Sequence, residues 1–172
     1  MKYENLIKEI TSWYNTDQIP VHINEPVITQ FDKDSVLKTL NDNWVSTAGP
    51  IVQEFEANIS TIFENKKVVA LNSGTSALHL ALLGLGVLPG EQIITTPLTF
   101  VAPLNAVKYV GGVPLFIDIS LKDLSIDIDK LYEYGEKYFY SKKNSTYDSN
   151  TGNLVRVLLV VDTFGHIGNI KK

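Results

Sequence analysis

The stretch Ala70-Leu71-Asn72-Ser73-Gly74-Thr75-Ser76-Ala77-Leu78-His79-Leu80-Ala81-Leu82-Leu83 decides how the rest of the chain is interpreted. Apolar residues 68–71 predict a short strand, and the Ala- and Leu-rich residues after the turn predict a helix over about 75–85. Because this helix is apolar nearly all round, we expect it to be buried. A small-residue turn between a strand and a helix presents free backbone N–H groups and the positive end of the helix dipole to an anion.

The turn itself, residues 73–76, allows two interpretations. Ser73, Thr75 and Ser76 offer hydroxyl groups and Gly74 permits close approach to the backbone, which together predict a phosphate-binding cup. The same residue types also begin ordinary helices, where they cap the backbone without any ligand. This stretch alone does not separate the two interpretations. We call residues 73–76 the Ser73–Ser76 turn.

The composition is that of a globular protein of ordinary size. The chain has 172 residues, 44% hydrophobic and 20% charged, enough for one domain with a substantial core. Its net charge of −4, without a basic run, argues against nucleic acid or an anionic membrane as a partner. No cysteine is present, the first residues are polar, and no apolar run approaches the roughly 20 residues of a membrane span. We therefore expect a cytoplasmic protein without disulfides.

The first third of the chain combines helical patterns with one polar loop. We expect a helix over residues 2–16, an extended stretch over 21–28, a helix that starts at Asp32 or Asp34, and a helix over about 51–63. Residues 41–50 form a loop by composition. Trp44 in this loop either anchors it to the core or contacts a ligand, and spacing alone favours the anchor.

From residue 92 onward, strands and helices alternate. We expect strands over 92–96, 113–118 and 155–161, and helices over 100–110 and from Asp127 or Asp129 to about Tyr140. The polar residues 141–153 predict a surface loop, and the apolar run 155–161 predicts a strand buried on both faces. This alternation predicts a parallel sheet with right-handed crossovers, whose functional residues gather at the carboxyl ends of the strands.

Four motifs occur in a fixed order along the chain. They are Asn43-Trp44 to Thr47-Ala48-Gly49-Pro50 followed by Glu54-Phe55-Glu56; Leu71 to Leu78; Pro89-Gly90-Glu91-Gln92-Ile93-Ile94 with Pro97-Leu98-Thr99-Phe100-Val101-Ala102; and Gly111-Gly112-Val113-Pro114 with Phe116-Ile117-Asp118. Together they resemble the DegT-type (DegT/DnrJ/StrS) sugar aminotransferases, pyridoxal phosphate (PLP) enzymes with the fold of aspartate aminotransferase. The resemblance runs from about residue 20 to the end.

This resemblance implies an α/β fold: the N-terminal part of the fold type I large domain, a mainly parallel sheet with helices on both faces. It divides the chain into residues 1–50, a helical and extended segment with a substrate loop, and residues 51–172, an incomplete PLP-binding large domain. It implies transfer of an amino group, usually from glutamate, to a keto sugar on a nucleotide, in surface-polysaccharide or amino-sugar biosynthesis. Because active sites of the family are completed across a dimer interface, it also implies a homodimer.

The resemblance also assigns site residues. The PLP phosphate would be held by Ser73, Gly74, Thr75 and Ser76, and Phe100 would stack on the cofactor ring. The substrate would contact Asn43, Trp44, Val45, Ser46 and Thr47. With the resemblance, ligand contact and loop anchoring are equally favoured as the role of Trp44.

Two functional groups of the family match nothing in this sequence: the Schiff-base lysine and the aspartate that binds the pyridinium nitrogen. Lys171 and Lys172 do not match that lysine, so no catalytic residue is assigned. For Asp162, a position near the substrate or the dimer interface is favoured over contact with the cofactor. We therefore expect a truncated enzyme that is inactive alone and binds PLP weakly at most. A PLP-dependent sugar dehydratase of the same fold and a non-catalytic truncated or partner subunit remain as alternatives.

The remaining candidates have structural explanations. Asp118 ends a strand and is expected to satisfy nearby backbone groups. His79 lies within the apolar helix and is expected to be packed and hydrogen-bonded. His22 and His166 have no spacing typical of a metal site, so no metal is assigned.

Overall fold

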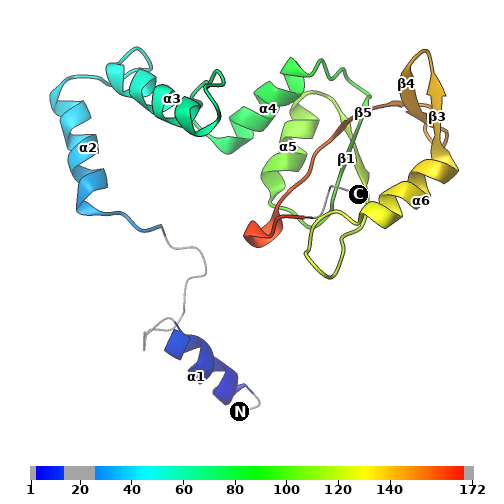
Figure 1. Ribbon diagram of the computed structural model, residues 1–172, viewed down its shortest axis with the longest axis horizontal. Coiled ribbons are helices and arrows are strands. Elements are labelled where there is room, and N and C mark those ends of the chain that lie inside the picture. The colour runs from blue at the N-terminus through cyan, green and yellow to red at the C-terminus, as the bar shows by residue number, and fades with distance from the viewer. Residues whose placement is uncertain (1–2, 14–25, 169–172) are drawn as a thin grey trace. The chain divides into compact units, whose positions relative to one another are not determined.

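The computed structural model describes residues 3–13 and 26–168, and the chain divides into two compact units, Met1–Val68 and Val69–Lys172. The elements of both units are shown in Figure 1. The two units differ in how much they bury. None of the residues in the three helices of the first unit is buried, whereas the second unit contains two clusters of buried hydrophobic residues.

The first unit is helical, as predicted. Its elements are α1 (Glu4–Trp13), α2 (Gln30–Asn41) and α3 (Pro50–Ile62). The predicted start of α2 was wrong, because Thr29 caps this helix and Asp32 lies within its first turn. The Thr29 hydroxyl accepts from the Asp32 N–H, and the Asp32 carboxylate accepts from the Thr29 N–H at 2.7 Å, which is a capping box. Of the predicted extended stretch, residues 21–25 lie outside the described residues, and 26–29 have no regular secondary structure.

The second unit is built on a five-stranded mixed sheet of order β2-β1-β5-β4-β3. Its strands are β1 (Gln92–Thr95), β2 (Val113–Phe116), β3 (Phe139–Lys142), β4 (Ser145–Asp148) and β5 (Leu154–Leu158). β1 is parallel to β2 and β5, whereas β4 is antiparallel to β3 and β5. The helices are α4 (Gly74–Gly84), α5 (Val101–Tyr109) and α6 (Ile128–Tyr138), and a short 3-10 turn, η1 (Thr163–Gly165), follows β5.

Helices cover both faces of this sheet. Ile93 of β1 packs in a cluster with residues of α4 and α5, namely Leu82, Ala106 and Val107. Its neighbour Ile94 packs in a second cluster that includes residues of α6. Because successive side chains of a strand point to opposite faces, α5 and α6 lie on opposite sides of the sheet. The predicted α/β fold with helices on both faces is confirmed.

The largest difference from the predicted fold is the segment 141–153. Instead of a surface loop, its first half completes a β-hairpin, β3 and β4, that extends the sheet. Lys143 and Asn144 form the two-residue turn with φ values of 49° and 62°, the conformation of a type I′ turn. The rings of Tyr140 and Tyr147 stack across the strands at 5.7 Å. Polar composition concealed this hairpin because only one face of an antiparallel ribbon needs to be apolar.

Three further predictions about secondary structure and burial were wrong. Residues 68–71 are not a strand in the described part of the structure. In α4 only Leu82 is buried, because the helix packs on α5 along one side. β5 ends at Leu158 and is not buried on both faces, since the exposed Arg156 reaches out to the carboxylate of Glu91.

Candidate functional site

The Ser73–Ser76 turn begins α4. Ser73 is the N-cap residue, and its hydroxyl oxygen accepts from the Ser76 N–H at 3.1 Å and lies 3.0 Å from the Ser76 hydroxyl. The capping interpretation is thus confirmed. It satisfies only part of the helix end, since the N–H groups of Gly74 and Thr75 find no acceptor within the described part of the chain.

The turn is open and is not filled by side chains. A Cβ atom placed on Gly74 would meet no other atom within 4 Å. Two unbonded N–H groups, the neighbouring hydroxyls and the positive end of the α4 dipole all favour an anion. These donors therefore fit the phosphate group of a cofactor.

Phe100 occupies the N-cap position of α5 with an extended backbone, and its side chain is 78% exposed. Its ring is therefore free to cover a flat ligand. The loop that carries it is held in place through the carbonyl oxygen of Leu98, which accepts from the hydroxyls of Thr96 and Thr163, both at 3.2 Å. None of the hydrogen bonds or ring contacts found in residues 26–168 joins Phe100 to the Ser73–Ser76 turn.

The predicted substrate loop belongs to the first unit. Trp44 packs on Gly49, where an added Cβ would lie 3.1 Å from the Trp44 side chain. The backbone N–H of Trp44 donates to the Thr39 carbonyl at 3.1 Å. Trp44 is nevertheless 43% exposed and Val45 is 81% exposed. Ser46 accepts from the Ala48 N–H at 3.3 Å, which shapes the loop locally. Trp44 thus anchors its own loop while keeping part of its ring accessible.

The candidate residues at strand ends have local partners. Asp118 accepts from the Ile119 N–H at 2.8 Å and pairs with Lys130 at 2.6 Å, which confirms its structural assignment, and the Lys130 hydrogen bond lowers the pKa of this carboxyl. Asp162 is exposed and accepts from the Gly168 N–H at 3.5 Å. Neither carboxylate is thereby linked to the Ser73–Ser76 turn.

The structure describes two of the three histidines, His79 and His166. His79 packs its ring edge-to-face on Tyr109 at 5.5 Å, which confirms the predicted packing. The expected hydrogen bond of this histidine is not among those formed by residues 26–168. His166 is exposed, and His22 lies outside the described residues. No group of three or more His, Asp or Glu side chains in residues 3–13 and 26–168 could hold a metal ion.

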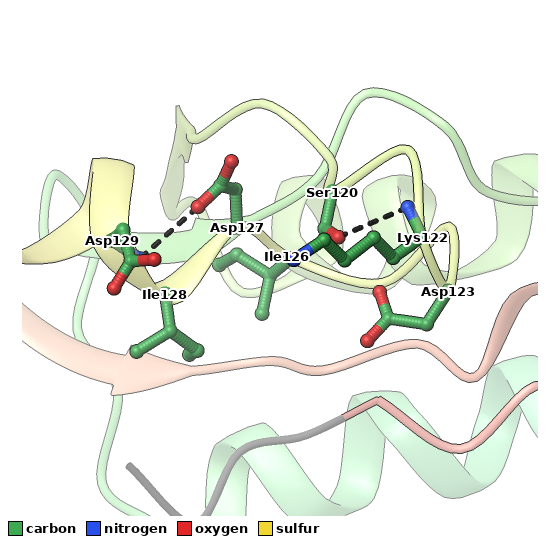
Figure 2. Close-up of a pocket in the computed structure, with 7 residues that line it drawn as sticks. All are labelled: Ser120, Lys122, Asp123, Ile126, Asp127, Ile128 and Asp129. Carbon is green, nitrogen blue, oxygen red and sulfur yellow. Dashed lines mark hydrogen bonds between the residues drawn. The ribbon is translucent and has the colours of Figure 1, made fainter.

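A cavity of about 280 Å³ lies in the loop between β2 and α6 (Figure 2). Its lining residues are Ser120, Lys122, Asp123, Ile126, Asp127, Ile128 and Asp129. Several of its polar groups serve the backbone, since Asp127 accepts from the Asp129 N–H at 3.0 Å and Ser120 from the Lys122 N–H at 3.2 Å (Figure 2). This cavity is therefore explained by loop folding and is separate from the Ser73–Ser76 turn.

Two sets of polar contacts around the sheet were not predicted from the sequence. Arg156 donates two hydrogen bonds to Glu91, at 2.9 Å and 2.6 Å, and these lower the pKa of the Glu91 carboxyl. The buried Asp148 accepts from Gln92 at 3.2 Å and from the Tyr134 hydroxyl at 3.0 Å, while burial raises the pKa of Tyr134. Both link residues more than ten positions apart, which no local pattern reveals.

None of the described helices is both long and apolar enough to cross a membrane.

Comparison with known proteins identifies the family of this chain. The model of the DegT/DnrJ/EryC1/StrS aminotransferase family matches residues 26–170. GDP-perosamine synthase of Escherichia coli O157:H7 is 38% identical over 100 residues, which are 58% of this chain and 27% of that protein. The spore coat polysaccharide biosynthesis protein SpsC of Bacillus subtilis strain 168 is 42% identical over 106 residues, 62% of this chain and 27% of that protein.

One further relative and one solved structure are also similar to this chain. The 3-oxo-glucose-6-phosphate:glutamate aminotransferase of B. subtilis strain 168 is 35% identical over 119 residues, 67% of this chain and 27% of that protein. Among solved structures, the PLP form of Spr1654 from Streptococcus pneumoniae has a TM-score of 0.60 at 33% identity and covers 66% of this chain and 29% of that one. The chain thus spans 27% of the length of each of these three curated relatives.

Proposed function

Because the chain belongs to the DegT/DnrJ/EryC1/StrS aminotransferase family, we propose that it supplies the phosphate-binding part of a PLP-dependent sugar aminotransferase. The enzyme would transfer an amino group from glutamate to a keto sugar carried on a nucleotide, in surface-polysaccharide or amino-sugar biosynthesis. The names of the relatives support each part: one makes a GDP-linked sugar, one uses glutamate, and one serves a spore coat polysaccharide. The PLP form of Spr1654 supports the cofactor.

The open Ser73–Ser76 turn is the observation that carries this proposal. The N–H groups of Gly74 and Thr75 would donate to the phosphate, and the hydroxyls of Ser73, Thr75 and Ser76 would complete its shell. Phe100 would cover one face of the cofactor ring, hold its orientation and exclude water from that face. When bound, PLP supplies an electron sink that lets an amino group move between carbon atoms.

The substrate side of the proposal rests on the loop at the start of α3. Asn43, Trp44, Val45, Ser46 and Thr47 would contact the sugar nucleotide, and the accessible part of the Trp44 ring offers an apolar surface for it. Residues 1–50 would form this substrate segment and residues 51–172 the cofactor-binding part. We further propose that the complete enzyme is a homodimer.

The 172 residues by themselves are proposed to be inactive, because no residue among them matches the lysine that carries the cofactor in the family. Incubation of the purified chain with PLP should give weak binding and no stoichiometric change in visible absorption. An absorption band that forms one-to-one and becomes fixed to a lysine on borohydride reduction would contradict this.

The activity is tested on the complete protein that carries this sequence. With PLP, glutamate and a panel of keto sugar nucleotides, it should release 2-oxoglutarate only when a matching sugar is present, and mass spectrometry should find nitrogen in the sugar product. Loss of a sugar oxygen without gain of nitrogen would contradict amino transfer and favour a dehydratase. No reaction of any sugar with bound PLP would contradict both.

A further inference from the structure

We propose that Phe164 forms a second aromatic wall of the same site and packs on the sugar ring of the substrate. This inference rests on the proposed function. The resemblance assigns Asp162, two residues earlier, to the substrate side or the dimer interface, and assigns no role to Phe164 itself. Four structural observations lead to it: the place of this residue in the sheet, its attachment, its exposure and its backbone conformation.

Phe164 and Phe100 follow neighbouring parallel strands. The chain runs from β1 through α5 to β2, then returns by way of α6 and the hairpin to β5, on the other side of β1. Because β2 and β5 lie on opposite sides of β1, the strand order reverses between β1 and β5. In open α/β sheets, ligands bind at the carboxyl ends of strands where the order reverses. Phe100 follows one of these two ends and Phe164 the other.

The loops that carry the two rings are attached to each other. The Thr163 hydroxyl donates to the Leu98 carbonyl at 3.2 Å, and the same oxygen accepts from Thr96. Thr163 is buried, whereas its neighbour Phe164 is 78% exposed, as is Phe100. The attachment therefore fixes two backbones at the carboxyl edge and leaves both aromatic side chains turned outward.

The backbone of Phe164 is in the left-handed region, with φ 56° and ψ 23°, and Gly165 follows with φ 78°. A bulky residue adopts this conformation at a cost that glycine or asparagine largely avoids. A side chain that is mostly exposed gains little from packing in return. Within the described residues, neither backbone preference nor packing accounts for phenylalanine here, and contact with a ligand would account for it.

The sugar is the part of the substrate that fits this position. In amino transfer the reacting sugar carbon must lie beside the cofactor ring, and Phe100 is the residue proposed to cover that ring. The Thr163–Leu98 hydrogen bond keeps the Phe164 loop next to the Phe100 loop. The base of a sugar nucleotide lies two phosphates and a ribose away from the sugar. An aromatic face at Phe164 would therefore meet the C–H face of the sugar ring.

The test uses the complete protein loaded with PLP. Binding of UDP-glucose and GDP-mannose, and of the sugar-free probes UDP and GDP, is measured by titration calorimetry. Phe164→Asn relieves the backbone and removes the ring, and Phe164→Tyr keeps the ring. Leu124→Asn is the matched control, because Leu124 is also a non-glycine residue at positive φ (58°), in the loop after β2.

Phe164→Asn should weaken binding of the sugar nucleotide that wild-type protein binds by roughly three- to tenfold, the worth of one aromatic contact. Binding of the sugar-free probe should stay unchanged, and the thermal midpoint should stay equal or rise, because asparagine tolerates this backbone. Phe164→Tyr should bind like wild type, and Leu124→Asn should change neither affinity.

Each of the other outcomes contradicts a specific part of the account. Unchanged sugar-nucleotide affinity in Phe164→Asn overturns the inference and leaves the proposed function standing. Equal weakening of the sugar-free probe assigns the ring to the nucleotide. A thermal midpoint of Phe164→Asn below that of wild type assigns the ring to structure. Both outcomes overturn the inference. A wild-type protein that binds PLP but none of the four probes overturns the assignment to a UDP- or GDP-linked sugar, on which the inference depends; the activity panel described above tests the proposed function separately.

Discussion

At the scale of single residues, Gly74 is the most informative position in the cofactor site. A Cβ atom there would enter open space, and the same is true of Gly84 at the other end of α4. Gly74→Val should therefore leave the fold intact but crowd the proposed phosphate position, and we expect PLP affinity of the complete protein to fall at least about tenfold. Gly84→Val is the matched control. Titration of apoprotein with PLP measures both, and equal affinities would contradict a phosphate site at this turn.

The Glu91–Arg156 pair gives a prediction on pH. The pKa of Glu91 is lowered in the folded protein, chiefly by the Arg156 hydrogen bond, from an ordinary value of 4.5. A lowered folded pKa adds stability that is complete above pH 4.5 and is lost as pH falls through the folded value. Glu91→Gln should reduce the free energy of unfolding by about 1–2 kcal/mol at pH 7, as expected for a charged hydrogen bond.

Denaturant unfolding of the complete protein at pH 7 and below pH 4 checks this. Wild type and Glu91→Gln should differ at pH 7 and converge in acid. A constant difference at both pH values would show that the carboxylate charge does not supply the stability.

At the scale of elements, the β3–β4 hairpin depends on its turn. Lys143 and Asn144 both adopt positive φ, a conformation that Asn-Gly adopts at lower cost. The double substitution Lys143→Asn with Asn144→Gly should raise the free energy of unfolding by about 0.5–1 kcal/mol. Asn144→Val should lower it, because a β-branched residue is strained there. Thermal unfolding measures both, and stabilisation by valine would show that the turn has another conformation.

Elements with strong local signals were predicted from the sequence. The strand β1, the helix α3 and the Ser73 cap each depend on neighbours within a few positions, so pattern and capping rules found them. The burial of α4 depends on neighbours distant in sequence, and its pattern alone predicted too much. The hairpin did leave a signal, since Tyr140, Thr146 and Tyr147 are strand-favouring residues within the polar segment.

The candidate site likewise has one part that local sequence predicts and one part that depends on the folded sheet. The Ser73–Ser76 turn is contiguous, so its residue types alone predicted its helix-capping geometry. The attachment of Thr163 to Leu98 joins residues 65 positions apart, and the left-handed backbone of Phe164 is not a local preference of phenylalanine. Both require the folded sheet to be known.

At the scale of the whole molecule, the helices of the first unit pose a question of stability. They bury none of their residues, and large side chains such as Phe31 (80% exposed) and Ile62 (71% exposed) stay in contact with water. Such surfaces associate in solution. We expect the purified 172-residue chain to self-associate at micromolar concentration, as sedimentation velocity would show. A monodisperse monomer that unfolds in a single cooperative transition would contradict this.

The central claim is that the Ser73–Ser76 turn holds the phosphate of PLP, and a crystal structure of the complete protein with PLP tests it most directly. We predict phosphate oxygens within hydrogen-bond distance of the Gly74 and Thr75 N–H groups, with the pyridine ring against Phe100. A phosphate bound elsewhere, with these two N–H groups donating to protein atoms, would contradict the account.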